Sequence, residues 1–107
     1  MSESLPRQDV HLEFHHWRLQ FVAGPGNRLE LFVNDCLRKA RQGAADETLY
    51  VWTNLELEWE EHRWLEARLL PRAAGGALLS VTVNGAAWVQ AVLTAGDEPR
   101  VTAFALP

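Results

Sequence analysis

The sequence has 107 residues, of which 48% are hydrophobic, and its formal net charge is −4. This length suits one domain with a single core, and the hydrophobic fraction is that of a globular chain rather than a disordered one. Nucleic acid and anionic membranes are not expected partners, because both require clustered lysines and arginines that this acidic chain lacks.

Cysteine occurs once, at Cys36, so no internal disulfide can form. The first nine residues, MSESLPRQD, lack the basic-then-apolar order of a secretion signal. No apolar run approaches the roughly 20 residues that cross a bilayer as a helix. Together these features predict a cytoplasmic protein.

The beginning of the chain predicts a flexible tail over residues 1–9, followed by a single β domain over residues 10–107. Residues 10–22 contain two alternating apolar patterns that are out of phase with each other. Because side chains on a strand alternate between faces, the change of phase at His15-His16 predicts a β-bulge or a bend. A tight hairpin is not expected there, because histidine is not typical of two-residue turns with positive φ.

Two later stretches predict β-hairpins. Asn34-Asp35 joins two strands within residues 28–41, and Asn84-Gly85 joins two strands within residues 77–93. Asparagine followed by Asp or Gly tolerates the left-handed backbone conformation that two-residue turns demand. The similarity between the two turns is explained by this shared turn chemistry.

The register of both hairpins follows from counting outward from each turn. This counting pairs Glu30 with Lys39, which have opposite charges, and it pairs Val81 with Trp88. One further short strand is predicted over residues 100–106, where apolar residues again alternate.

The stretch 49–70 alternates apolar and polar residues, which is the pattern of half-buried strands. Its apolar odd positions are Leu49, Val51, Leu55, Leu57, Trp59, Leu65, Ala67 and Leu69. A reversal at residues 61–63 makes this stretch a hairpin and places Glu56 opposite Arg68, a favourable cross-strand pair.

The many short strands and turn signals predict an all-β fold. We expect a single-domain antiparallel β-sandwich of about seven to nine short strands, or a barrel-like version of it. The alternative is an α+β fold with a helix at residues 54–70. Thr53 and Glu56 have the spacing of a capping box, and Pro71 would end such a helix.

Three side chains near the start of the chain form a candidate metal site. His11, Glu13 and His15 lie at every second position, so a strand presents all three on one face. Two imidazoles and a carboxylate suit Zn²⁺, Fe²⁺ or Mn²⁺. The alternative is that these residues form the solvated face of a half-buried strand and bind no metal.

Three aromatic side chains form a candidate binding site. Tyr50, Trp52 and Trp64 share the polar parity of the central stretch, where exposed tryptophans are unexpected in a plain monomer. This placement predicts a flat platform for a sugar ring or for a partner's side chain. The alternative is that another segment covers this face and makes the tryptophans part of the core.

An acidic run lies in the same stretch. Its members are Glu56, Glu58, Glu60, Glu61 and Glu66. Two carboxylates two positions apart on a strand, as Glu58 and Glu60 are, stand about 6.6–7 Å apart, which suits the acid and base of a glycoside hydrolase. The simpler interpretation is the solvated side of an amphipathic strand, where like charges also discourage edge-to-edge aggregation.

The sequence contains no recognisable catalytic set and predicts no cofactor. We therefore expect a non-catalytic binding or interaction module of unknown ligand, which acts through the aromatic sheet face or by self-association as a homodimer. A metal-binding protein that uses the His-x-Glu-x-His strand face, with zinc or another divalent transition metal, is the second interpretation. A carbohydrate-binding domain that uses the same tryptophans is the third.

Overall fold

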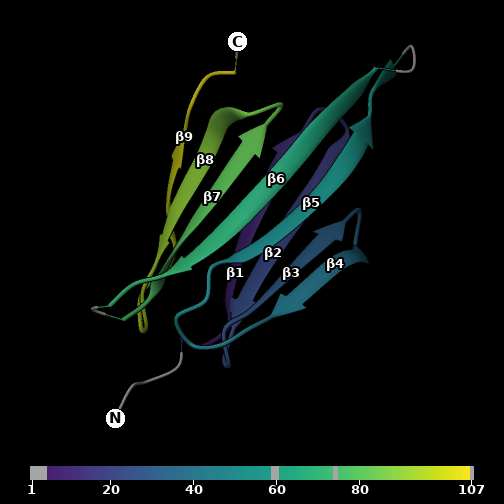
Figure 1. Ribbon diagram of the computed structural model, residues 1–107. Coiled ribbons are helices and arrows are strands. Elements are labelled where there is room, and N and C mark those ends of the chain that lie inside the picture. The colour runs from purple at the N-terminus through teal and green to yellow at the C-terminus, as the bar shows by residue number, and fades with distance from the viewer. Residues whose placement is uncertain (1–4, 59–60, 74, 107) are drawn as a thin grey trace.

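Figure 1 shows the computed structural model of the protein, which describes residues 5–58, 61–73 and 75–106. Within these residues, nine strands form two antiparallel sheets of four and five strands. The first sheet has the order β1-β2-β3-β4, with β1 at Gln8–Phe14, β2 at Trp17–Gly24, β3 at Arg28–Val33 and β4 at Cys36–Gln42. The second has the order β5-β6-β7-β8-β9, with β5 at Leu49–Glu56, β6 at His62–Pro71, β7 at Ala77–Val83, β8 at Ala86–Leu93 and β9 at Arg100–Ala103.

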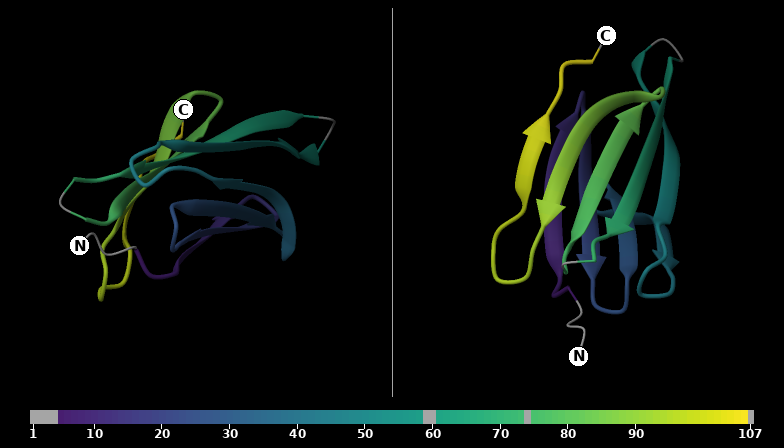
Figure 2. Two further views of the ribbon diagram at one scale, coloured as in Figure 1. Left: turned by 60° about the horizontal axis from the view of Figure 1, so that its bottom comes forward. Right: turned by 60° about the vertical axis from the view of Figure 1, so that its left-hand side comes forward.

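The predicted all-β antiparallel sandwich is confirmed, and the observed strand number lies within the predicted range. Each sheet is a meander, because consecutive strands pair with each other, and the chain passes from the first sheet to the second between β4 and β5. The two sheets lie face to face, as the two further views show (Figure 2). The barrel-like version is not the one observed, since the strands divide into two separate sheets.

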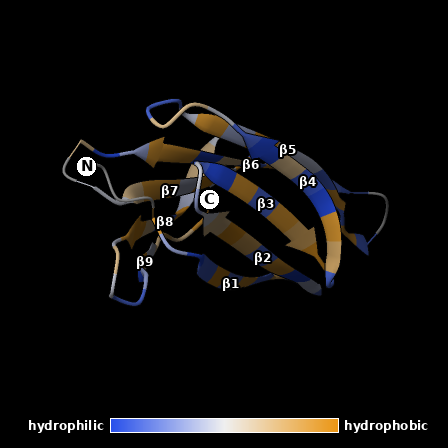
Figure 3. Cartoon of the chain, turned by 90° about the horizontal axis from the view of Figure 1, so that it is seen from below, coloured by the Kyte–Doolittle hydropathy of each residue, from blue (hydrophilic) through white to orange (hydrophobic). Residues whose placement is uncertain are grey.

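The core lies between the sheets and is built by alternation. In β7, for example, every second residue is buried, starting from Ala77 and ending with Val83. Alternating hydrophobic and hydrophilic bands along most strands make the same pattern visible (Figure 3). The largest fully buried side chains are Phe21, Leu19, Leu29, Leu31, Leu55, Leu65, Leu79, Leu93, Val51, Val81 and Val89. Because both sheets contribute to this set, neither sheet could bury its apolar face without the other.

The central stretch forms β5 and β6, so the alternative of a helix at residues 54–70 is wrong. The predicted register of this hairpin is also wrong: Glu56 lies opposite His62, six residues before the predicted partner Arg68. An even shift leaves every side chain on its predicted face, because strand side chains alternate with period two. The odd positions of β5 and the apolar odd positions of β6 are therefore buried as expected, while the predicted inward Trp59 lies outside the described residues.

The predicted bulge or bend at His15-His16 is instead a two-residue turn. Phe14 pairs directly with Trp17, and β1 and β2 form a tight hairpin. His15 takes the positive φ that such a turn needs, at 54°. Histidine, like Asn and Asp, is enriched several-fold among the non-glycine residues with positive φ, so the expectation rested on too strict a rule.

The β3–β4 and β7–β8 hairpins, whose turns stand 50 residues apart (34 and 84), are built alike. Asn34 donates its backbone N–H to the Arg18 carbonyl at 2.8 Å, and its Oδ1 accepts the Arg18 backbone N–H at 2.9 Å. Asn84 makes the same two bonds with Trp64, both at 2.8 Å. Each asparagine thus links its turn to the neighbouring strand of the sheet that precedes the hairpin, β2 for Asn34 and β6 for Asn84. Each also adopts the positive φ of the turn.

Both of these hairpins also contain one extra residue, which sequence counting did not predict. In β4 the extra residue is Arg38, so Glu30 lies opposite Ala40 rather than opposite the predicted lysine. In β8 the extra residue is Trp88, so the predicted pair with Val81 is not formed. Such bulges twist a strand and re-aim its side chains. Both extra residues reach other elements: Arg38 Nη1 donates to Thr53 Oγ1 in β5, and the Trp88 ring lies 5.3 Å from the Phe14 ring of β1.

The two ends of the chain differ slightly from expectation. β1 begins at Gln8 rather than at residue 10, and the Gln8 side chain donates to the Thr94 carbonyl at 3.2 Å. β9 ends at Ala103 rather than at residue 106. The start of the predicted tail, residues 1–4, lies outside the described residues.

The hydrogen bonds and the positive φ of Asn84 predict a measurable loss of stability when this residue is replaced. Asn84→Ala should lower the free energy of unfolding by about 1–3 kcal/mol, because alanine is strained at positive φ and the bond to the Trp64 N–H is lost. Asn84→Gly keeps the conformational freedom and loses only that bond, so its loss should be smaller. Urea unfolding measures both values, provided that the m-values of the variants equal that of the wild type. If Asn84→Ala were as stable as the wild type, the proposed contribution of the Asn84 side chain would be wrong.

Candidate binding face

The outward side of β5 and β6 carries a set of side chains that we call the aromatic face. Its members are Tyr50, Trp52, Trp64, Glu66 and Arg68. Their placement follows from the pleat: the odd positions of both strands point into the core, so the even positions point away from it. The pairing places Tyr50 opposite Arg68 and Trp52 opposite Glu66. The three aromatic residues therefore lie on one side of the sheet, as their shared parity in the sequence indicates, and their role in binding stays a prediction.

The two tryptophans stack on each other. Their ring centroids lie 4.8 Å apart and their planes are inclined by 21°. They are diagonal neighbours, since Trp52 lies opposite Glu66 and Trp64 lies opposite Asn54. Trp64 is 38% exposed, and Trp52 is half-buried. The alternative in which both tryptophans belong to the core is therefore not observed.

The ammonium group of Lys39 covers Trp52, the more buried of the two tryptophans. The Lys39 Nζ lies 4.0 Å from the centre of the Trp52 ring. Lys39 belongs to β4, the last strand of the other sheet, and it follows the bulged Arg38, whose Nη1 donates to Thr53 Oγ1 at 3.3 Å. An indole has two faces, and both the ammonium and the second indole lie within 5 Å of the Trp52 centre. Little of the Trp52 ring is therefore left for a ligand.

The polar members of the face hold its aromatic members in place. Trp64 donates its indole N–H to Glu66 Oε1 at 2.6 Å, and the Arg68 Nη2 lies 3.5 Å from Glu66 Oε2. The Arg68 guanidinium carbon in turn lies 4.9 Å from the centre of the Tyr50 ring. A continuous series of contacts thus connects Trp64 to Tyr50 through one carboxylate and one guanidinium.

The structure corrects the shape predicted for this site. The sequence predicted a flat platform of three rings, whereas the two tryptophans stack on each other and the tyrosine lies beneath Arg68. Sequence reasoning also missed Lys39, because its contact comes from the other sheet and no local pattern reports it. Arg68 was missed for a different reason: the predicted register placed it opposite Glu56 instead of Tyr50.

The predicted metal ligands are only partly brought together. His11 and Glu13 lie exposed on the outward face of β1, as expected, but His15 lies in the turn and packs edge-on against Phe14 at 4.7 Å. On the same face, the hydrogen bond and the charge of Arg7 hold the pKa of Asp9 below its ordinary value, and the charge of His11 adds to this effect. Among the residues that the structure describes, no three His, Cys, Asp or Glu side chains form a group that could hold a metal ion.

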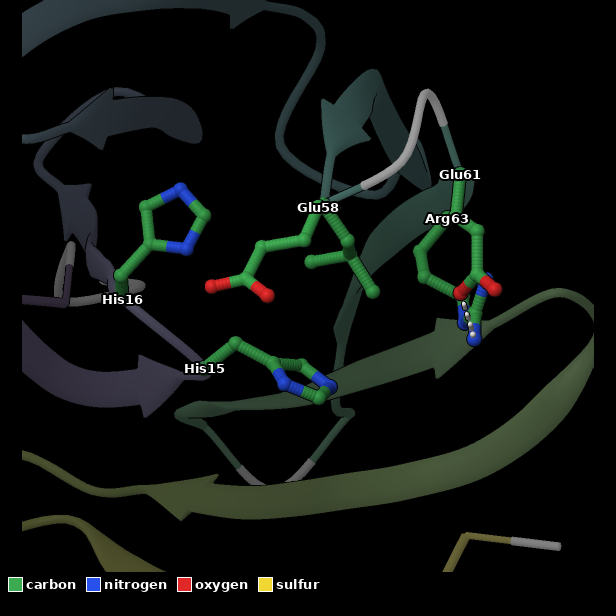
Figure 4. A pocket seen from close by; sticks show the side chains of 6 residues that line it. His15, His16, Glu58, Glu61 and Arg63 are labelled. Carbon is green, nitrogen blue, oxygen red and sulfur yellow. Dashed lines mark hydrogen bonds and ion pairs between the residues drawn. The ribbon is translucent and has the colours of Figure 1, made fainter.

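A pocket lies where the β1–β2 and β5–β6 hairpins end. His15, His16 and Glu58 point into it, and Arg63 contacts Glu61 at its rim, as Figure 4 shows. Its volume is about 520 Å³, a size that suits small ligands. Among the described residues that line it, Leu57 is the one apolar side chain, whereas small-molecule sites are lined mostly by apolar groups. The pocket is therefore a poorer candidate than the aromatic face.

Of the predicted pair of catalytic carboxylates, Glu60 lies outside the described residues. Glu58 faces the two histidines of the pocket rather than the aromatic face. Within the described part of the chain, no helix is long and apolar enough to cross a membrane.

Comparisons with known protein families, with curated proteins and with solved structures find no match to this chain.

The contact between Lys39 and Trp52 predicts an energetic coupling between the two sheets. A double-mutant cycle with Lys39→Met and Trp52→Leu should give a coupling of about 0.5–1 kcal/mol, the range of an exposed cation–aromatic contact. Lys39→Met keeps most of the aliphatic chain, so the cycle reports on the charge. Chemical unfolding of the four proteins measures the coupling. Additive effects of the two substitutions would show that the ammonium contributes nothing.

Proposed function

We propose that this protein is a non-catalytic binding module that contacts its partner through the aromatic face. The observation that carries this proposal is the exposed indole of Trp64, held in one orientation by Trp52 on one side and by Glu66 at its N–H. Large aromatic side chains that remain accessible on a rigid strand supply contact area at a low cost in conformational entropy. Tryptophan is also among the residues that contribute most to binding energy at interfaces.

The surroundings of the ring support the same proposal. The face lies on two strands that pair along their whole length, so its side chains are positioned before any ligand arrives. Glu66 beside the Trp64 ring and Arg68 two residues further along β6 supply one negative and one positive group, as in the polar rim of an interface. The exposed thiol of Cys36 is compatible with a reducing compartment, which supports the proposed cytoplasmic location.

A ligand panel tests this function. Short neutral peptides, basic peptides, acidic peptides and oligosaccharides are added in turn while a two-dimensional amide spectrum is recorded. At least one class should shift the indole N–H of Trp64 and the amides of β5 and β6, with the shifts centred on the aromatic face. Trp64→Ala should abolish these shifts and leave the remaining spectrum well dispersed.

Stability measurements separate a binding role of Trp64 from a core role. Trp64→Ala should change the free energy of unfolding far less than Phe21→Ala, because Phe21 is 1% exposed and its truncation costs about 3–5 kcal/mol. Equal losses for the two variants, or a panel in which no class shifts the aromatic face, would contradict the proposed function.

Self-association is a second candidate, and the edge strand β9 favours it. β9 pairs with β8 on one side only, and its neighbourhood exposes Val101 and Phe104, at 48% and 41%. Apolar residues on an unprotected edge promote pairing with another strand, and a second copy is the simplest source of that strand.

The oligomeric state tests this second candidate. Sedimentation at increasing concentration should show a dimer, and Val101→Lys should shift the protein toward the monomer by placing a charge on the edge. Val101 is exposed, so this substitution leaves the core intact. A wild-type protein that stays monomeric at the highest soluble concentration would contradict self-association.

A further inference from the structure

The aromatic face contains three rings, and the protein's own cations occupy two of them. The Lys39 ammonium lies over Trp52 at 4.0 Å, and the Arg68 guanidinium lies over Tyr50 at 4.9 Å. Trp64 is the third ring and the most exposed of the three. Among the described residues, no cation lies over it as one lies over each of the other two.

The free side of Trp64 can be located from the pairing. One side stacks on Trp52, which belongs to the neighbouring row of the sheet. The next row in the opposite direction is the pair Glu56 and His62, where the hairpin approaches its end. The free side of the indole is therefore directed toward this end of the hairpin.

The charges near this free side favour a cation. Glu66, whose Oε2 lies 3.5 Å from the Arg68 guanidinium, accepts the indole N–H at 2.6 Å through Oε1, and an acceptor at this position increases the electron density of the ring and thus its attraction for a cation. Glu56 is exposed in the adjoining row, opposite His62. The one guanidinium of the loop end, that of Arg63, is paired with Glu61 at 3.2 Å. An anion would meet net repulsion here, as it would from the chain as a whole, whose formal charge is −4.

We propose that the free side of Trp64 binds an arginine or lysine side chain of a basic segment in a partner protein. This inference rests on the proposed binding function and specifies the chemistry of its ligand. Trp64 would then hold a cation as Trp52 and Tyr50 already do, so that the ligand completes a column of alternating charges and rings. Arginine is the better fit, because its planar guanidinium stacks on an aromatic face and loses little hydration.

The test compares two peptides that differ only in charge. A short unstructured peptide with several arginines is titrated into the full-length protein, and the same peptide with citrulline at each arginine serves as the neutral control. The arginine peptide should shift the Trp64 indole N–H and bind at least about tenfold more tightly than its citrulline counterpart. Its affinity should fall as the salt concentration rises.

Three variants assign the effect to this ring. Trp64→Leu should weaken binding of the arginine peptide by roughly tenfold, whereas Trp64→Phe, which keeps an aromatic face, should weaken it less. Glu66→Gln keeps an acceptor for the indole N–H and removes the charge, so it should weaken binding and reduce the salt dependence. Phe32→Leu, a half-buried aromatic on the outward parity of β3 in the other sheet, should bind as the wild type does.

The outcomes separate this inference from the proposed function. If the arginine and citrulline peptides bind equally, or if Trp64→Leu leaves binding of the arginine peptide unchanged, the cation site is wrong. If an oligosaccharide or a neutral peptide shifts Trp64 while the basic peptide does not, the cation site is wrong and the binding function stands. If no ligand of any class shifts the aromatic face, both are wrong.

Discussion

The strict alternation of inward and outward side chains is the constraint on which the rest of this structure depends. Burying Leu55 and Leu65 against the first sheet forces Trp52 and Trp64 to the outside of the second sheet. The same residues that build the core thus determine where the candidate binding face lies. A candidate binding surface of this kind needs no loop to present it, because its side chains stand on two paired strands.

The alternation also explains how much could be predicted. The sandwich, the turns at Asn34 and Asn84, and the outward placement of the aromatic residues all follow from local patterns. The register of β5 and β6 could not be obtained in this way, because several hairpin lengths satisfy the same parity. The prediction for the faces remained correct because the register error was an even number of residues.

The remaining errors have a common cause. The bulges at Arg38 and Trp88 each insert one extra residue into a strand, and the turn at His15 depends on one positive φ; periodicity reports neither. The bulge in β4 matters more for the site, because the next residue is Lys39, whose ammonium contacts the Trp52 ring. Because this contact joins residues of two different sheets, no local sequence pattern reveals it and it is visible only in the folded chain.

Lys39 is the only lysine of the chain, and its amine lies against the aromatic face. Any chemistry directed at lysine side chains, whether enzymatic acylation or a laboratory reagent, therefore has a single side-chain target in this protein. Acylation would remove the charge from the Trp52 ring and would place a neutral amide beside the tryptophan stack. Two of the chain's five tryptophans form this stack, so the tryptophan fluorescence would change with the covalent state of one defined amine.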